Sequence, residues 1–167
     1  MRKVAILLAL LVLSTMVFGF GDGTKRAGVH LNYGGGDLEL GFGGRFEMDL
    51  DEFLPVQDLV FAGNYNYFLC NDPEGFDLTA YQFSFDLLNM EMPTTGNFKF
   101  YYGTGICFDF VKVKSKGPWK EKASANETGI ELILGGRYKI ENLLGYTEIK
   151  TSLGGFEKII LTTGILF

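Results

Sequence analysis

Apolar and polar residues alternate with a period of two along most of this chain. In DLELGFGGRFEMDL, residues 37–50, leucine, phenylalanine and methionine fall on one face, and acidic residues, glycine and Arg45 fall on the other. The segments NFKFYYGTGICFDF, residues 97–110, and TGIELILGGRYKIE, residues 128–141, repeat the pattern. Strict alternation over such lengths predicts β-strands with one apolar face and one polar face.

Weaker alternation predicts five more strands, which brings the expected total to eight. The connections between them suit hairpins, and none has room for a crossover helix. The longest connection is KSKGPWKEKASAN, residues 114–126. The pattern therefore predicts an all-β chain of antiparallel, up-and-down strands. The five weaker strands lie near residues 26–33, 58–70, 77–88, 145–152 and 156–167.

Two features indicate which face lies inside a barrel of these strands. Roughly 35 large apolar side chains share the apolar face, and the interior of an eight-stranded barrel is too narrow for that volume. The polar face instead combines charges of both signs with many glycines, as a crowded concave interior requires. We therefore expect polar side chains inside and apolar side chains against lipid, in a closed transmembrane β-barrel without unpaired strand edges. The inward glycines are predicted to be Gly41, Gly43, Gly103, Gly105, Gly129 and Gly135.

The start of the chain has the features of a secretory signal peptide. A basic pair precedes an uninterrupted apolar run over residues 4–13, which is short for a membrane span. Small residues then offer cleavage after Gly19 or Gly21. We expect a signal peptide at residues 1–21 and the barrel at residues 22–167, with an uncleaved anchor as the alternative.

The composition agrees with strands and tight turns. Among 167 residues there are 23 glycines, 16 phenylalanines and 8 tyrosines. The net charge of −5 becomes −7 once Arg2 and Lys3 leave with the signal peptide, which argues against a nucleic-acid partner. No later apolar run approaches the ~20 residues of a membrane helix. Whether Cys70 and Cys107 form a disulfide is left open.

The last segment, GFEKIILTTGILF, ends on an aromatic residue with no polar tail behind it. Ile159, Leu161, Ile165 and Phe167 share its outward face. This ending resembles the C-terminal signature of bacterial outer-membrane β-barrel proteins, and the whole chain is similar to the class of small eight-stranded members. The resemblance implies an outer-membrane location, a lipid environment and recognition by the barrel-assembly machinery, with Phe167 as the assembly signal.

Charged residues on the inward face are the main candidates for a functional site. We predict an interior ion-pair network, which plugs an eight-stranded barrel, whereas a narrow conduction path is the alternative reading of the same charges. A four-residue turn at 142–145 sets Lys139 opposite Glu148 and Arg137 opposite Lys150, so that Glu148 serves both Lys139 and Arg137. The predicted network is Glu39, Arg45, Glu47, Glu131, Arg137, Lys139 and Glu148, and the other inward charges are Lys99, Asp109, Glu141 and Lys150.

Little else in the sequence indicates chemistry. His30 is the only histidine and falls inside by parity, with Gly28 and Asn32. Ser84 is a plausible inward serine, but no motif links it to His30, so we expect no enzyme, no cofactor and no bound metal. Trp119 in the longest loop is either a contact for lipid headgroups or a partner, or an incidental aromatic.

Three functions are compatible with these observations. The leading one is a non-enzymatic outer-membrane barrel with a structural, adhesive or other envelope role and no open pore. The alternatives are a soluble periplasmic carrier resembling lipocalins and a membrane-embedded lipid-modifying enzyme. The sequence names no ligand and no surface partner.

Overall fold

A computed structural model describes most of the chain after its first 24 residues. The predicted signal peptide and Trp119 lie outside the described residues, and of Glu39 only the backbone is described. Within the described part, no helix is long and apolar enough to cross a membrane. The described ranges are 25–34, 38–51, 53–55, 58–70, 75–90, 94–95, 97–116, 122–154 and 158–167.

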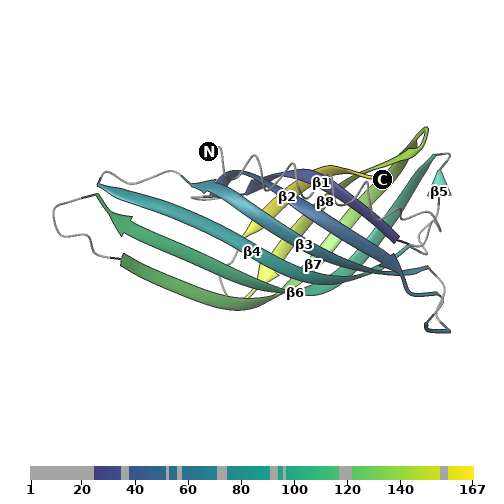
Figure 1. Ribbon diagram of the computed structural model, residues 1–167. Coiled ribbons are helices and arrows are strands. Elements are labelled where there is room, and N and C mark those ends of the chain that lie inside the picture. The colour runs from purple at the N-terminus through teal and green to yellow at the C-terminus, as the bar shows by residue number, and fades with distance from the viewer. Residues whose placement is uncertain are drawn as a thin grey trace.

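Eight long strands and one two-residue strand make up the described structure (Figure 1). The short strand, β5, pairs with the start of the strand that follows it. The strands are β1 (Lys25–Gly34), β2 (Leu38–Asp49), β3 (Leu59–Cys70), β4 (Phe76–Asn89), β5 (Thr94–Thr95), β6 (Phe98–Ser115), β7 (Lys122–Ile140), β8 (Leu143–Leu153) and β9 (Ile159–Leu166).

The sheet closes on itself, so the long strands form a barrel. Each long strand pairs antiparallel with its neighbours in sequence, and β1 pairs with both β2 and β9. At the seam between β1 and β9, the Phe167 amide donates to the Ala27 carbonyl at 2.9 Å, and the Ala27 amide donates to the Phe167 carbonyl at 3.2 Å. The predicted eight-stranded, up-and-down antiparallel barrel is confirmed.

Polar side chains fill the interior and apolar side chains cover the exterior, as predicted. Leu132 and Leu134 on β7 are 46% and 56% exposed, whereas Glu131 on the same strand is fully buried. Gln82 on β4 is likewise fully buried. Because an exterior of exposed leucine, isoleucine and phenylalanine is stable in hydrocarbon but not in water, the barrel spans a membrane, and the soluble carrier is not favoured.

Inward glycines leave room for large interior side chains. Gly135 lies under the ring of Tyr101, and a Cβ built at Gly135 would stand 2.6 Å from the Tyr101 hydroxyl oxygen. Tyr101 is itself fully buried. The predicted role of the glycines in a crowded interior is confirmed at this position.

The turn between β7 and β8 differs from the prediction. It consists of Glu141 and Asn142 alone, and Glu141 has a left-handed φ of 52°. Strand pairing therefore resumes at Leu143, and Arg137 stands opposite Tyr146. The predicted register was wrong because a two-residue turn suffices here and Leu143 and Leu144 extend the strand instead of forming a loop.

The connection between β6 and β7 is also shorter than predicted. The expected loop over residues 114–126 is largely strand, because β6 continues to Ser115 and Lys114 pairs with Lys122. The alternation of Val111 and Val113 with lysines on β6 carries the strand past the end of the apolar exterior. As a result β4, β6 and β7 extend furthest at one end of the barrel, the left end in Figure 1.

Candidate functional site

The interior contains an ammonium group held among three carboxylates. Lys150 on β8 places Nζ 2.6 Å from Asp86, 3.5 Å from Glu148 and 3.6 Å from Glu131. All four side chains are buried, with Lys150 only 3% exposed. Asp86 also accepts a hydrogen bond from the Asn64 amide at 2.8 Å. Lys150 therefore neutralises charge contributed by β4, β7 and β8 together.

Two arginines extend this network toward the end of the barrel where β1 begins and β9 ends. The Arg45 guanidinium donates to Glu148 at 2.8 Å, and the Tyr101 hydroxyl donates to the same carboxylate oxygen at 2.8 Å. The Arg137 guanidinium donates a hydrogen bond to the Glu47 carboxylate at 2.6 Å. The same carboxylate forms an ion pair with Arg45 at 2.7 Å. Glu148 thus serves two cations, but they are Arg45 and Lys150, so the predicted pairing of Glu148 with Lys139 and Arg137 is wrong.

Several ion pairs of the interior join strands that are not adjacent and therefore cross the lumen. Arg137 on β7 and Glu47 on β2 belong to strands that are opposite each other in the closed order of the barrel. Lys158, just before β9, pairs with Asp109 on β6, again from non-adjacent strands. The charged side chains consequently occupy the middle of the lumen as well as its wall.

Neutral hydrogen bonds occupy the neighbouring level of the interior. His30 contacts the Tyr146 hydroxyl at 2.8 Å through Nδ1 and the Asn66 side-chain oxygen at 2.6 Å through Nε2. Asn66 in turn donates to Gln82 at 2.8 Å, and Gln82 donates to Glu131 at 3.0 Å. His30 is buried, as its parity predicted, and it bonds to a tyrosine and an asparagine.

Ser84 is also buried, but its hydrogen-bond partner is not one of the partners of His30. It accepts a hydrogen bond from Asn64 at 3.2 Å. The structure therefore places His30 and Ser84 in separate hydrogen-bonded groups. The geometry shows no serine–histidine contact of the kind that activates a nucleophile.

Apolar side chains complete the interior on either side of the polar network. One cluster contains buried Val60, Ala62, Leu88, Met90, Tyr101 and Ile133. A second contains Phe68, Ala80 and Ile160, with Cys70 and Val111 packed against it. The two cysteines are free thiols, and Cys107 is fully buried beside Ser152, with 3.7 Å between Sγ and the hydroxyl oxygen.

The remaining predicted site residues lie at the edges of the network. Lys139 is exposed at the barrel mouth and forms no ion pair with any described side chain, and Glu141 is exposed in the turn after β7. Lys99 pairs with the partly exposed Asp58 at 2.6 Å. The side chain of Glu39 is outside the described residues.

Sequence reasoning missed several members of the network. Asp86 shares the parity of Ser84 on β4, so alternation alone is enough to predict that its side chain points inward. Tyr101 and Tyr146 were assigned no role, because nothing in a single strand shows that a hydroxyl reaches a carboxylate on another strand. Lys158 precedes the last strand and has the inward parity of Ile160.

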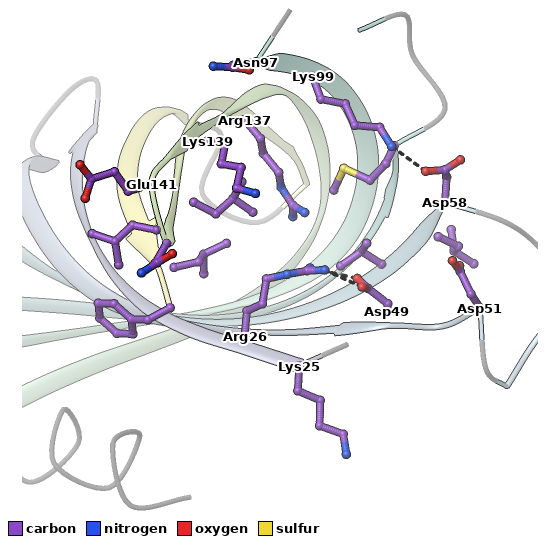
Figure 2. Close-up of a pocket in the computed structure, with 18 residues that line it drawn as sticks. Lys25, Arg26, Asp49, Asp51, Asp58, Asn97, Lys99, Arg137, Lys139 and Glu141 are labelled. Carbon is purple, nitrogen blue, oxygen red and sulfur yellow. Dashed lines mark hydrogen bonds and ion pairs between the residues drawn. The ribbon is translucent and has the colours of Figure 1, made fainter. Parts of the chain in front are cut away.

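A cavity of about 710 Å³ opens at the end of the barrel where β1 begins and β9 ends (Figure 2). Its rim carries both signs of charge, and two of its pairs are Arg26 with Asp49, at 2.9 Å, and Lys99 with Asp58. Figure 2 shows Arg137 projecting into this opening. The cavity is therefore a vestibule with charged and apolar walls, and Arg137, which lines it, pairs with the buried Glu47.

Known structures share this architecture. The N-terminal β-barrel domain of Pseudomonas aeruginosa OprF has a TM-score of 0.62 and 10% identity, covering 85% of this chain and 96% of that one. Neisserial surface protein A has a TM-score of 0.59 and 16% identity, covering 85% and 94%. Ail, the attachment invasion locus protein of Yersinia pestis, has a TM-score of 0.54 and 12% identity, covering 85% and 93%. A scan against protein-family models and a search of curated proteins find no match.

The chain has the fold of the small eight-stranded bacterial outer-membrane β-barrels. Its apolar exterior agrees with that class, since such a surface requires lipid. Within the described residues, its interior is organised around the ion-paired network centred on Lys150 and Glu148.

Proposed function

We propose that this protein is a non-enzymatic structural component of the outer membrane with a closed lumen. The observation that supports it is the run of buried, mutually bonded side chains that crosses the lumen. Arg137 contacts Glu47, Arg45 contacts Glu148, and Lys150 contacts Asp86, each pair joining non-adjacent strands.

An open ion path is disfavoured by the energetics of this network. A passing ion has to displace groups that are each other's counter-charges, and breaking one buried pair typically costs about 3–5 kcal/mol. The apolar cluster around Phe68 and Ile160 lies inside the opposite end, where it offers a hydrated ion no ligands. Several such barriers in series are expected to keep the lumen closed to ions.

Electrical recording tests the closed lumen. The purified full-length barrel is inserted into planar bilayers, and wild type is expected to give no reproducible conductance steps. A matched pair of single variants extends the test, with Lys150→Met inside the network and Lys139→Met at the exposed mouth. Regular conductance steps in wild type whose ion selectivity changes in Lys150→Met would overturn the proposal.

An adhesive role is the second candidate, and the extension of β6 and β7 favours it. These strands have 18 and 19 residues, and together with β4 they extend furthest at the end away from Phe167. With the termini in the periplasm, this hairpin stands on the cell surface. Binding of expressing bacteria to host-cell monolayers, compared with a strain whose residues 115–122 are replaced by a two-residue Asn-Gly turn, tests it. Equal binding by both strains would reject adhesion through the hairpin.

A further inference from the structure

The outward face of β6 changes from aromatic to basic at one position. Going along the strand, its alternate outward side chains are apolar or aromatic up to Phe110, with Thr104 as the exception, and the next three on this face are lysines, the last just past the end of β6. Lys112, Lys114 and Lys116 are all exposed. A row of cations on an acidic chain of net charge −5 is a strong local departure from the composition of the rest.

The length of the apolar row places this change at the edge of the membrane. From Phe100 to Phe110 the strand advances ten residues, which is ~33 Å at the usual rise for an antiparallel strand. With a strand tilt of ~40°, the row spans ~25 Å of membrane height, the thickness of the apolar band of such barrels. Lys112 therefore stands at the level where hydrocarbon gives way to headgroups.

Packing shows that the lysines face the membrane side and not the lumen. Val111 packs against the interior cluster of Phe68, Ala80 and Ile160, so the neighbouring Lys112 is directed outward. Its ammonium lies 5.2 Å from the centre of the Tyr81 ring. The Tyr81 ring stacks on Phe110 with 4.9 Å between centroids and a 7° interplanar angle. Lys112 is thus fixed above an aromatic platform that itself faces lipid.

Few anions oppose these lysines on the adjacent strands. Asp77 on β4 forms an ion pair with Lys116 at 2.9 Å and stands in register with Lys114. On β7, the residue in register with Lys112 is Ser124, which is neutral. The three lysines of this row therefore carry two more positive charges than the single carboxylate on the same face of β4 neutralises.

We propose that the face formed by Lys112 and Lys114 binds the phosphate groups of anionic lipids in the adjacent leaflet. Cations next to a membrane attract anionic headgroups by about 1 kcal/mol each, a factor of about five. Lipid is favoured over a soluble polyanion because the lysines continue the row that Phe108 and Phe110 begin, so their side chains meet headgroups without leaving the membrane surface. The aromatic platform of Tyr81 and Phe110 accommodates the upper part of the lipid below the phosphate.

Quenching of a single tryptophan by brominated lipids tests this site directly. Trp119 is the only tryptophan, so Phe110→Trp in a Trp119→Phe background places one reporter just below Lys112. The full chain is reconstituted in phosphatidylcholine vesicles that contain either brominated phosphatidylglycerol or brominated phosphatidylcholine at equal fractions. We expect the anionic lipid to associate about 25-fold more strongly at this reporter, a factor of about five from each of the two lysines, and the preference to fall at high salt as charges are screened.

Two controls separate the site from a general effect of charge. Phe100→Trp in the same background reports on the opposite leaflet and is expected to show no preference. With the Phe110→Trp reporter, Lys112→Gln combined with Lys114→Gln should abolish the preference, whereas Lys99→Gln combined with Lys139→Gln at the mouth should preserve it. Folding of each variant is checked by its heat-dependent mobility on SDS gels.

Two results would overturn the proposal. The first is equal quenching by both lipids at the Phe110→Trp reporter in a folded barrel. The second is a lysine-dependent change in fluorescence when a soluble sulfated polysaccharide is added to vesicles that show no lipid preference. That second result would assign the lysine face to a soluble polyanion instead.

Discussion

At the scale of single residues, the interior is organised by groups that have several partners. Lys150 faces three carboxylates, and Glu148 receives Arg45, Lys150 and the Tyr101 hydroxyl. A buried group with several charged partners is costly to remove, because every partner is left without compensation. Charged groups at the exposed mouth that have one partner or none cost less to remove, since water solvates the partner that remains.

Replacing Lys150 by Met should be strongly destabilising. It leaves Asp86, Glu131 and Glu148 close together with one cation fewer, and we expect a loss of about 3–5 kcal/mol in the free energy of unfolding. Urea unfolding in lipid vesicles measures it. Lys139→Met removes the same charge from the exposed mouth and should cost no more than about 0.5 kcal/mol. Equal losses in the two variants would show that the interior is as hydrated as the mouth.

Gly135 tests the packing of the interior without changing any charge. Gly135→Ala brings a methyl group against the Tyr101 ring, which is held by its bond to Glu148. We expect a loss of about 1–3 kcal/mol, as is typical when a close-packed site is overfilled. Gly63→Ala is the matched control, because a Cβ at this position meets only Phe85, at 3.9 Å. The same unfolding assay decides, and a neutral Gly135→Ala would mean that Tyr101 moves freely.

At the scale of strands, alternation predicted the elements and their faces but not the register. All eight long strands, the inward position of His30 and the outward rows on β6 and β7 follow from a period of two. The β7–β8 register does not, because it depends on whether the turn takes two or four residues, and Gly145 in "ENLLG" suggested the longer one. An error in turn length shifts every cross-strand pair, which is why Lys139 was matched to Glu148.

An arginine scan along the outward rows should show a dependence on membrane depth. Leu134 is the third of six outward positions between Ile130 and Ile140, so Leu134→Arg places a charge near the midplane and should cost about 2–4 kcal/mol. Phe100 is the second outward residue of its row on β6, after Phe98, and Phe100→Arg should cost about 1 kcal/mol or less. Unfolding in vesicles gives both values. Greater damage from Phe100→Arg than from Leu134→Arg would place the membrane differently from the apolar band.

At the scale of the whole barrel, closure decides which charges meet. The predicted membership of Arg45, Glu47, Glu131, Arg137 and Glu148 in a charged interior follows from parity, because parity needs only one strand. Their partners depend on strands that lie across the lumen, such as β2 and β7, and therefore on the stagger of the closed sheet. No local feature of the sequence reports that stagger, so Asp86, Tyr101 and Lys158 became visible as partners only in the closed structure.

Closure of the barrel also involves Phe167, whose side chain and backbone have separate roles that can be tested. Its backbone pairs with Ala27 at the seam, and its side chain is 48% exposed on the exterior. Phe167→Ala keeps both backbone bonds and loses only the exposed ring, so refolding into synthetic vesicles should change by no more than about 0.5 kcal/mol. If the ring is read by the assembly machinery, the yield of folded barrel in cells should nevertheless fall.

A matched variant on the same strand separates recognition from stability. Leu161 is 45% exposed on the same outward face of β9, so Leu161→Ala removes a comparable apolar group without touching the end of the chain. The heat-resistant, folded fraction in isolated outer membranes is compared between Phe167→Ala and Leu161→Ala. A fall confined to Phe167→Ala assigns the terminal ring to assembly, because the two variants differ in position and hardly in stability. Equal yields would mean that the ring contributes only its contact with lipid.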